Sequence, residues 1–366
     1  MRVLLTGGAT GGHIYPALAM ARYIRKKNPT AEVLFVGAKG GMEEKIIPQA
    51  GFALQTLKVK GFPRRFTKAL GKSIFLMVIA VINAVRILKR FKPDVIIGTG
   101  GFAAGPVVMA GLMYRKRIIL HEQNVLPGLA NRMFAPWVYR VCLSFDESKN
   151  YFRRRSNLYL TGNPRASEVV EVDKESARIL LKLDTELPLV LAVGGSGGAE
   201  KLNKSVLDFL FLSVGNKNLQ VLYITGEKYY EQVISRLKNG NIIEYYGGRL
   251  QVKAYQQEMP LAISAADLII TRAGATTLAE LTALGRPAIV VPSPNVVHNH
   301  QLLNARELST HGAASLLEEK ELSGQALQKE VYRVLYNSYL LEEMAQKSRS
   351  LGCTDAVKNI YTHLFY

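Results

Sequence analysis

The chain carries the same local pattern twice: an apolar run, a glycine-rich turn and the start of a helix. The first copy reads VLLTGGATGGH over residues 3–13 and opens a helix near Pro16. The second reads VLAVGGSGGA over residues 190–199 and opens a helix near Glu200. Such a turn exposes backbone N–H groups beside the positive end of the helix, which suits a phosphate or a developing anion. One copy is common in α/β domains, but two copies this far apart predict two similar domains that face each other across a cleft.

Apolar runs that predict strands alternate with helical segments along the chain. Most of these runs are β-branched without polar alternation, as expected of parallel strands that are buried on both faces. The expected strands are residues 3–6, 32–36, 95–97, 117–120, 139–143 and 158–161, followed by 189–193, 220–225, 242–246, 268–271 and 288–291. The fold class is therefore α/β, with two Rossmann-like, doubly wound parallel sheets.

A domain boundary fits Gly162-Asn163-Pro164, just after the last expected strand of the first half. We expect an N-terminal domain over residues 1–163 and a C-terminal domain over residues 164–339. Propensity does not decide on which domain the last helices, over about residues 340–366, pack; the N-terminal domain is one option.

The positive charge of the chain is concentrated in its first half. The net charge is +18, and residues 1–165 hold 27 Lys and Arg against 7 Asp and Glu, while the rest holds 20 against 22. This asymmetry predicts an anionic partner, such as nucleic acid, an acidic membrane surface or a phosphorylated substrate. No nucleic-acid-binding module and no aromatic stacking pattern is present, which argues against nucleic acid. The two cysteines suit a reducing compartment better than a disulfide framework.

The segment Ile74–Ile82 is apolar and has basic residues on both sides. It is shorter than the roughly 20 apolar residues that a transmembrane helix needs. Preceded by Phe62, Pro63 and Phe66, it suits insertion at an anionic bilayer surface. The alternative, with equal weight for the helix itself, is a buried core helix with a solvated basic end.

Polar residues follow three expected strands of the first half. His13 closes the first glycine-rich turn, a second turn (GTGGF) spans residues 98–102, and HEQN spans residues 121–124. Side chains at these strand ends are where α/β sheets place ligands. Histidine titrates near neutral pH and can accept a proton there. Taken alone, His13 is more readily explained by a hydrogen bond within its own turn. A dinucleotide site is disfavoured, because no acidic residue clearly ends the second strand.

The second half has two comparable segments. Residues 272–277 (RAGATT) follow a strand and open a helix, and Glu280 falls one turn later. The N–H groups and threonine hydroxyls suit a diphosphate, and the carboxylate suits the hydroxyls of a ribose. His298 and His300 lie in HNHQ, but their spacing and the lack of a nearby carboxylate argue against a metal site. No Asp-x-Asp pair is present to hold a cation on a diphosphate, so helix dipoles and N–H groups would stabilise a leaving diphosphate.

Seven motifs in this order resemble the MurG family of bacterial cell-wall glycosyltransferases: GGATGGH, GTGGF-x-x-GP, HEQN, TGNPR, GGSGGA, RAGATT-x-x-E and HNHQ-x-x-NA. The resemblance spans essentially the whole chain. It implies the GT-B fold and inverting transfer of N-acetylglucosamine from its UDP donor to the 4-hydroxyl of the muramyl sugar of lipid I, which forms lipid II. It also implies that no metal and no cofactor takes part. Another GT-B UDP-sugar transferase with a lipid acceptor is the alternative.

The resemblance also implies roles for individual residues. In the first domain, Thr10, Gly11, Gly12 and Asn124 contact the donor. In the second domain, the diphosphate contacts Arg165 and Ser196, and the nucleotide contacts Ala275, Thr276 and Thr277. The ribose contacts Glu280, and the uracil lies near Gln256. The sugar hydroxyls contact His300 and Gln301. His13 is the favoured general base, with Glu122 and His121 as rivals. Phe102, Gly197 and Gln256 depart from the usual family residues at their positions.

The resemblance places such a chain at the cytoplasmic face of the cell membrane as a peripheral protein. Its expected partners are UDP-N-acetylglucosamine, lipid I and an anionic membrane surface, with the cell-wall and division machinery as a further partner. The basic first half and the segment Phe62–Ile82 would then dock on lipid.

Overall fold

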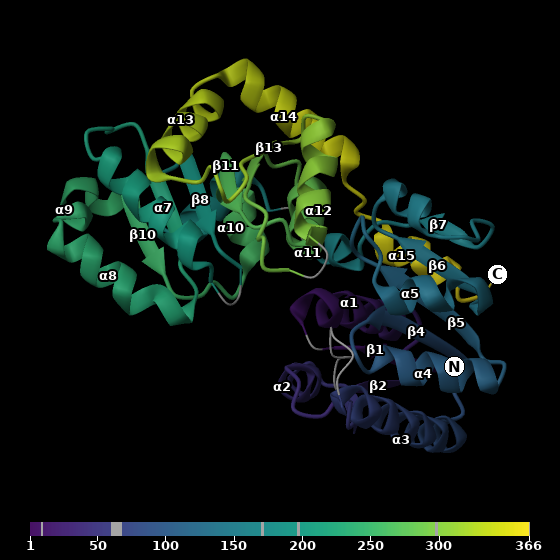
Figure 1. Cartoon of the computed structure of the whole chain (residues 1–366). Coiled ribbons are helices and arrows are strands. Elements are labelled where there is room, and N and C mark those ends of the chain that lie inside the picture. Colours follow the sequence, from purple (N-terminus) through teal and green to yellow (C-terminus); the bar gives the residue numbers. More distant parts are fainter. Residues whose placement is uncertain (9, 60–67, 170–171, 196–197, 297–298, 366) are drawn as a thin grey trace. The chain divides into compact units, whose positions relative to one another are not determined.

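The computed structural model describes the chain except residues 9, 60–67, 170–171, 196–197, 297–298 and 366. It separates into two compact units (Figure 1). Unit 1 comprises Met1–Glu168 and Cys353–Tyr366, and unit 2 comprises Val169–Gly352.

Unit 1 is built on a parallel sheet of seven strands in the order β3-β2-β1-β4-β5-β6-β7. The strands are β1 (Arg2–Gly7), β2 (Glu32–Ala38), β3 (Ala53–Leu57), β4 (Val95–Gly100), β5 (Arg117–Glu122), β6 (Arg140–Leu143) and β7 (Leu158–Leu160). Its helices are α1 (Gly11–Lys27), α2 (Glu43–Gln49), α3 (Lys68–Phe91), α4 (Ala104–Met113), α5 (Leu129–Phe134) and α15 (Ala356–Thr362), with 3-10 turns η1 (Ala135–Trp137), η2 (Asp146–Tyr151) and η3 (Pro164–Glu168).

Alternate residues of these strands enter two different cores. Val3 and Leu5 of β1 pack with α1 and α15, whereas Leu4 packs with α3 and α4 on the opposite face. Because both faces are covered, the middle residues of the central strands are apolar, and polar residues stand at the strand ends. This explains why the apolar runs in the sequence do not alternate with polar residues.

Unit 2 is built on a parallel sheet of six strands in the order β10-β9-β8-β11-β12-β13. The strands are β8 (Leu189–Val193), β9 (Gln220–Ile224), β10 (Leu250–Lys253), β11 (Leu268–Thr271), β12 (Ala288–Val290) and β13 (Ala314–Leu316). The helices are α6 (Lys174–Leu180), α7 (Glu200–Leu212), α8 (Tyr230–Asn239), α9 (Ile242–Tyr246), α10 (Met259–Ala265), α11 (Ala275–Ala283), α12 (His300–Thr310), α13 (Gly324–Leu335) and α14 (Ser338–Leu351), with 3-10 turns η4 (Glu227–Tyr229) and η5 (Gly247–Arg249). The expected fold class, two doubly wound parallel sheets, is confirmed.

One predicted strand is wrong: residues 242–246 form helix α9. Ile242 and Tyr246 are buried and lie four residues apart, while Tyr245 between them is exposed, which is the spacing of a helix face. Helix α1 also begins earlier than expected, at Gly11 rather than near Pro16. The strand that follows α9, β10, is one of three that the apolar-run criterion missed; the others are β3 and β13. All three are edge strands with partly exposed residues, so they lack a continuous apolar run.

The two units meet in sequence after Glu168, a few residues later than the boundary expected from sequence. Turn η3 packs on α1 and α15, and the carboxylate of Glu168 binds Arg22 of α1 at 2.7 Å. Of the last two helices, α14 packs on α11 and α13 in unit 2, and α15 packs on α1 in unit 1. The C-terminal helices therefore divide between the units.

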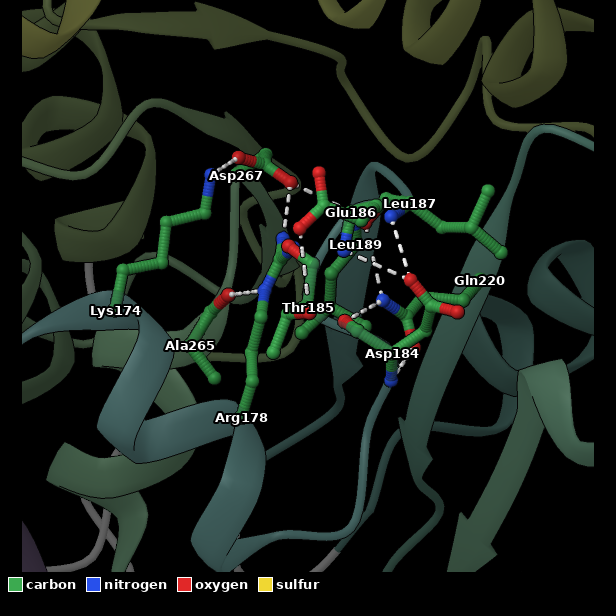
Figure 2. Close-up of polar contacts among 10 residues, drawn as sticks. All are labelled: Lys174, Arg178, Asp184, Thr185, Glu186, Leu187, Leu189, Gln220, Ala265 and Asp267. Carbon is green, nitrogen blue, oxygen red and sulfur yellow. Dashed lines mark hydrogen bonds and ion pairs between the residues drawn. The ribbon is translucent and has the colours of Figure 1, made fainter.

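A buried arginine fixes α6 to the sheet of unit 2 (Figure 2). Arg178 is 1% exposed and donates to the carbonyls of Ala265 and Thr185 at 3.0 and 2.6 Å. Its Nη2 lies 2.6 Å from the carboxylate of Asp267, which also accepts from the backbone N–H of Leu189 at the start of β8. The guanidinium thus joins three segments of the unit.

Candidate functional site

The polar segments of unit 1 end neighbouring strands of one sheet. Strand β1 lies between β2 and β4, so the chain order reverses there, and β5 lies next to β4. His13 follows β1 in α1, Thr99 and Gly100 end β4, and residues 121–124 end or follow β5. In doubly wound sheets, ligands bind outside the carboxyl ends of the strands at such a reversal point.

His13 is held by one nitrogen of its ring. Nδ1 lies 2.8 Å from the carbonyl oxygen of Thr99 and 3.2 Å from Oε1 of Gln123. A carbonyl can only accept a hydrogen bond, so Nδ1 carries the proton in the neutral ring and Nε2 is the basic nitrogen. Gly100 lies against this ring: it has φ +101°, and a Cβ there would lie 2.8 Å from the imidazole. The alternative in which His13 only bonds its own turn is not what the structure shows, since its partners come from β4 and β5.

His121 is fully buried and its two ring nitrogens both have partners. Nε2 lies 3.1 Å from the carbonyl of Gly162, and Nδ1 lies 3.0 Å from the amide nitrogen of Gln123. Burial lowers the pKa of His121 to about 4, because the charged ring would lose its hydration. His121 is therefore neutral near physiological pH, and it is poorly placed to reach a substrate.

Glu122 is also buried, and its carboxylate is occupied by donors of its own loop. The backbone N–H groups of Asn124 and Gly128 donate to it at 3.0 and 2.9 Å, and the amide of Asn131 donates at 2.8 Å. This carboxylate folds the loop that follows β5 and thereby places Asn124, whose side chain is half-buried. Of the three candidates for the general base, His13 is the one whose side chain is partly exposed.

A residue that sequence reasoning missed, Glu43, lies beneath the turn before His13. Thr10 and Gly12 are exposed and Gly11 is half-buried, so their surfaces are accessible. Glu43 of α2 is completely buried, and a Cβ on Gly8 or Gly41 would lie 2.0 or 2.3 Å from its carboxylate. The carboxylate also accepts from the N–H of Ala38 at 2.7 Å. The carboxyl group of Glu43 therefore lies beneath the glycine-rich turn where the sequence predicted a phosphate site. Its only sequence signal was a Glu shortly after the glycines at 40 and 41.

In unit 2 the corresponding reversal point lies between β8 and β11. Helix α11 begins directly after β11 with Ala275, Thr276 and Thr277. The Oγ1 atom of Thr276 is buried and has no hydrogen-bond partner among the described residues. Glu280 is 6% exposed, so it is not the ordinary solvent-facing glutamate that a single residue would suggest. An orphan hydroxyl at a helix N-terminus fits a bound phosphate or hydroxyl.

Of the remaining predicted residues that the structure describes, Gln256 lies in a loop of unit 2, and two lie at the start of α12. His300 begins α12, and the side chain of Gln301 accepts from the backbone N–H of Ser293 at 2.8 Å. A cavity of about 350 Å³ lies beside this loop, lined by Ser293, Asn299 and residues 318–320 among others. The oxygen of Gln256 lies 3.1 Å from the ammonium of Lys253. Ser196, His298 and Gly197 lie outside the described residues.

Arg165 does not lie in the predicted domain. It lies in η3 of unit 1, not in the second domain. Its guanidinium binds Glu168 at 2.8 Å and lies 5.5 Å from the ring centroid of Tyr15 in α1. The motif TGNPR, where the sequence predicted the domain boundary, lies before Glu168, where this part of unit 1 ends. Arg165 was therefore assigned to the second domain although it belongs to unit 1.

The chain matches two family models in sequence order. Residues 3–143 match the glycosyltransferase family 28 N-terminal domain, and residues 189–360 match the glycosyltransferase family 28 C-terminal domain. Among solved structures, MurG of Acinetobacter baumannii is 27% identical, with a TM-score of 0.77 over 99% of this chain and 98% of that chain. A UDP-N-acetylglucosamine 2-epimerase of Neisseria meningitidis has a TM-score of 0.68 over 100% and 99% of the two chains, but at 15% identity it shows the fold alone.

Curated relatives match along the full length. A protein of Caldanaerobacter subterraneus is 42% identical over 99% of this chain and 98% of its own, and one of Bacillus subtilis is 39% identical over 100% and 99%. Both are named UDP-N-acetylglucosamine–N-acetylmuramyl-(pentapeptide) pyrophosphoryl-undecaprenol N-acetylglucosamine transferase. With its two matched domains, its GT-B-like pair of parallel sheets and its full-length relatives, the chain belongs to the MurG family of glycosyltransferase family 28.

Proposed function

We propose that this glycosyltransferase transfers N-acetylglucosamine from UDP-N-acetylglucosamine to N-acetylmuramyl-(pentapeptide) pyrophosphoryl-undecaprenol, lipid I, to form lipid II. The match along 99% of the chain to a transferase of this name, at 42% identity, is the observation that carries the proposal. Transfer inverts the anomeric centre and needs no metal ion.

Unit 2 supplies the features that suit the nucleotide of the donor. The first residues of α11 present N–H groups and the orphan hydroxyl of Thr276 at the positive end of the helix. Glu280, one turn later and almost buried, is placed on the ribose hydroxyls. Gln301 and His300 at the start of α12 contact the sugar, and Gln256 lies near the uracil.

Unit 1 supplies the base. Nε2 of His13 takes the proton from the 4-hydroxyl of the muramyl sugar as the hydroxyl oxygen bonds to the anomeric carbon of the donor. The bond from that carbon to the diphosphate oxygen breaks, and its electron pair leaves with UDP. Thr10, Gly11, Gly12, Asn124 and Arg165 contact the donor sugar and its diphosphate.

The test is a transfer assay with labelled UDP-N-acetylglucosamine and a short-chain lipid I analogue, with EDTA present. We expect the label to appear in the lipid with stoichiometric release of UDP. Transfer to a different lipid acceptor, or UDP release without lipid labelling, contradicts the acceptor assignment. Turnover that EDTA abolishes and Mg²⁺ restores contradicts the metal-free mechanism.

We also propose that unit 1 docks on an anionic membrane at the cytoplasmic side, through α3, α4 and α5. On α3, Phe75, Val78 and Ile82 are 64, 52 and 48% exposed and lie on one helix face, which continues in Arg86 and Lys89. Helix α4 packs on α3, and α5 packs on α4. These two helices and the residues just after α4 add exposed apolar and basic side chains: Met109, Met113, Arg115, Leu129, Arg132 and Met133. An apolar surface bordered by basic residues suits a negatively charged lipid surface.

Within the described part of the chain, no helix has the length and apolarity to cross a bilayer. Phe62, Pro63 and Phe66, which were expected to help in docking, lie outside the described residues. Contact with the cell-wall and division machinery stays a prediction.

For Ile82→Glu, we expect binding to vesicles that contain anionic lipid to fall at least about tenfold, because the variant loses apolar contact and adds a repelled charge. Co-sedimentation with vesicles measures this. Leu212→Glu is a matched control, since Leu212 on α7 of unit 2 is 47% exposed and Ile82 is 48% exposed. Equal losses in both variants, or binding unchanged by Ile82→Glu, contradict docking through α3.

A further inference from the structure

None of the roles assigned to the donor and acceptor motifs uses Gln123. This residue is 2% exposed and lies between His13 and His121. We propose that Gln123 is a positioning residue that holds the His13 ring with its proton on Nδ1, so that Nε2 is the nitrogen that accepts the hydroxyl proton. This inference rests on the proposed function, because it concerns the same base.

The direction of each hydrogen bond follows from the backbone carbonyls at the two ends of this hydrogen-bond network, because a carbonyl can only accept. The carbonyl of Gly162 only accepts, so Nε2 of His121, 3.1 Å away, carries the proton, and Nδ1 of His121 must accept. The Gln123 atom 3.0 Å from that Nδ1 is therefore the amide nitrogen. The same nitrogen lies 2.8 Å from the carbonyl of Thr99, which again requires a donor.

With both amide protons assigned, Oε1 of Gln123 is left to accept from Nδ1–H of His13 at 3.2 Å. The Thr99 carbonyl accepts from the same Nδ1–H at 2.8 Å, and the Thr99 hydroxyl donates to the backbone carbonyl of His13 at 2.8 Å. Every polar atom of the Gln123 amide has a partner, and reversing the amide would set its oxygen against the Thr99 carbonyl. The buried amide therefore has one stable orientation.

This arrangement favours the form of His13 that the reaction produces. When Nε2 takes the hydroxyl proton, the imidazolium keeps Nδ1–H pointed at two oxygen acceptors, and a hydrogen bond from a charged donor is stronger than one from a neutral donor. Burial of His121, which lowers its pKa to about 4, keeps that ring neutral near physiological pH and preserves its acceptor nitrogen.

Other charged groups on the surrounding elements are held by their own partners. Glu122 of β5 accepts from Asn131 and its loop N–H groups, and Glu43 of α2 accepts from Ala38. Arg165 of η3 is paired with Glu168. His121 is the neighbour that communicates with His13 through Gln123.

The test is Gln123→Met, which keeps the side-chain length and removes both polar groups. We expect kcat to fall about ten- to hundredfold, since a hydrogen bond to the imidazolium is lost. The protonated ring is then less favoured, so the basic form persists to lower pH. The acidic limb of the kcat/KM profile should move to lower pH by about 1 unit. In the His13→Ala background the same substitution should cause no further loss.

Asn131→Leu is the matched control. Asn131 is buried at 5% exposure and donates to the His121 carbonyl and to Glu122, and among the described residues no hydrogen bond joins it to the His13 ring. It should lower stability without moving the acidic limb. If Gln123→Met also leaves the limb in place, or if its loss adds fully to that of His13→Ala, then Gln123 is only structural and the inference is wrong.

A second measurement needs no substrate and so separates this inference from the proposed function. ¹⁵N NMR of the histidine rings, with His13 assigned by its loss in His13→Ala, reports which nitrogen carries the proton. We expect Nδ1–H for His13 in the native chain. In Gln123→Met the Thr99 carbonyl still accepts from Nδ1, so we expect the Nδ1–H tautomer to remain the main form with a smaller share than in the native chain. A native His13 with its proton on Nε2 overturns the inference, whatever the transfer assay shows. The expected tautomers without lipid I turnover would instead contradict the proposed function alone.

Discussion

Replacement of His13 by alanine is expected to lower kcat for transfer about 10²–10⁴-fold, the range that a positioned general base contributes. The hydroxyl would then lose its proton to water, while the nucleotide features of α11 are untouched. Affinity for UDP should therefore be unchanged. Single-turnover transfer and equilibrium binding of UDP together measure the two effects.

His311→Ala is the control for loss of a histidine. His311 caps the C-terminus of α12, where its ring binds the carbonyl of Glu307 at 2.8 Å and has no part in the proposed chemistry. Its removal should leave kcat unchanged. A His13→Ala enzyme that keeps more than a tenth of the native kcat would assign the base to another group, and His121 and Glu122 would then be tested in the same way.

Replacement of Arg178 by methionine is expected to destabilise unit 2 by about 3–5 kcal/mol, the typical effect of breaking a buried ion pair. The substitution removes the partner of Asp267 and the donor to two backbone carbonyls (Figure 2). Asp267 would keep the N–H of Leu189 and the ammonium of Lys174, so its carboxylate would be only partly compensated.

Urea unfolding of the full chain can assign this loss to one unit. The single tryptophan, Trp137, lies in unit 1, so its fluorescence reports unit 1 while far-UV circular dichroism reports both units. We expect the dichroism transition to move to lower urea and the fluorescence transition to stay.

Lys174→Met removes the more exposed of the two ion pairs of the Asp267 carboxylate. The Lys174 side chain is 42% exposed, so its ion pair with Asp267 should contribute less than about 1 kcal/mol. If Arg178→Met costs no more than Lys174→Met, the buried guanidinium is not what holds α6 on the sheet.

Much of the fold was predictable because nearly every residue of the central strands packs into a core. Strands such as β1, β4, β8 and β11 are covered on both faces, so each reads as an unbroken apolar run that ends in glycine or polar residues. In parallel sheets these ends lie at one edge, which is why His13, the residues 121–124 and the start of α11 could be predicted as site residues before any contact was known.

The edges of the sheets and the helix α9 were not predictable in the same way. Edge strands β3, β10 and β13 mix buried and partly exposed residues, and α9 is too short to show more than one helical turn. Whether such a segment pairs with a strand or coils beside it depends on neighbours that are distant in the sequence.

The fold class and the strand ends at which the polar residues gather were readable from local periodicity and spacing, and the family was indicated by the seven motifs that resemble it. Packing, in contrast, controls which side chains are accessible. It buried His121 and Glu122 among partners, placed Glu43 beneath the first glycine-rich turn, assigned Arg165 to unit 1 and set Gln123 between two histidines. The cited hydrogen bonds join the start of α1, the end of β4 and the residue that follows β5. The bonded residues are 24 to 110 positions apart in sequence, so only packing of the sheet brings them together.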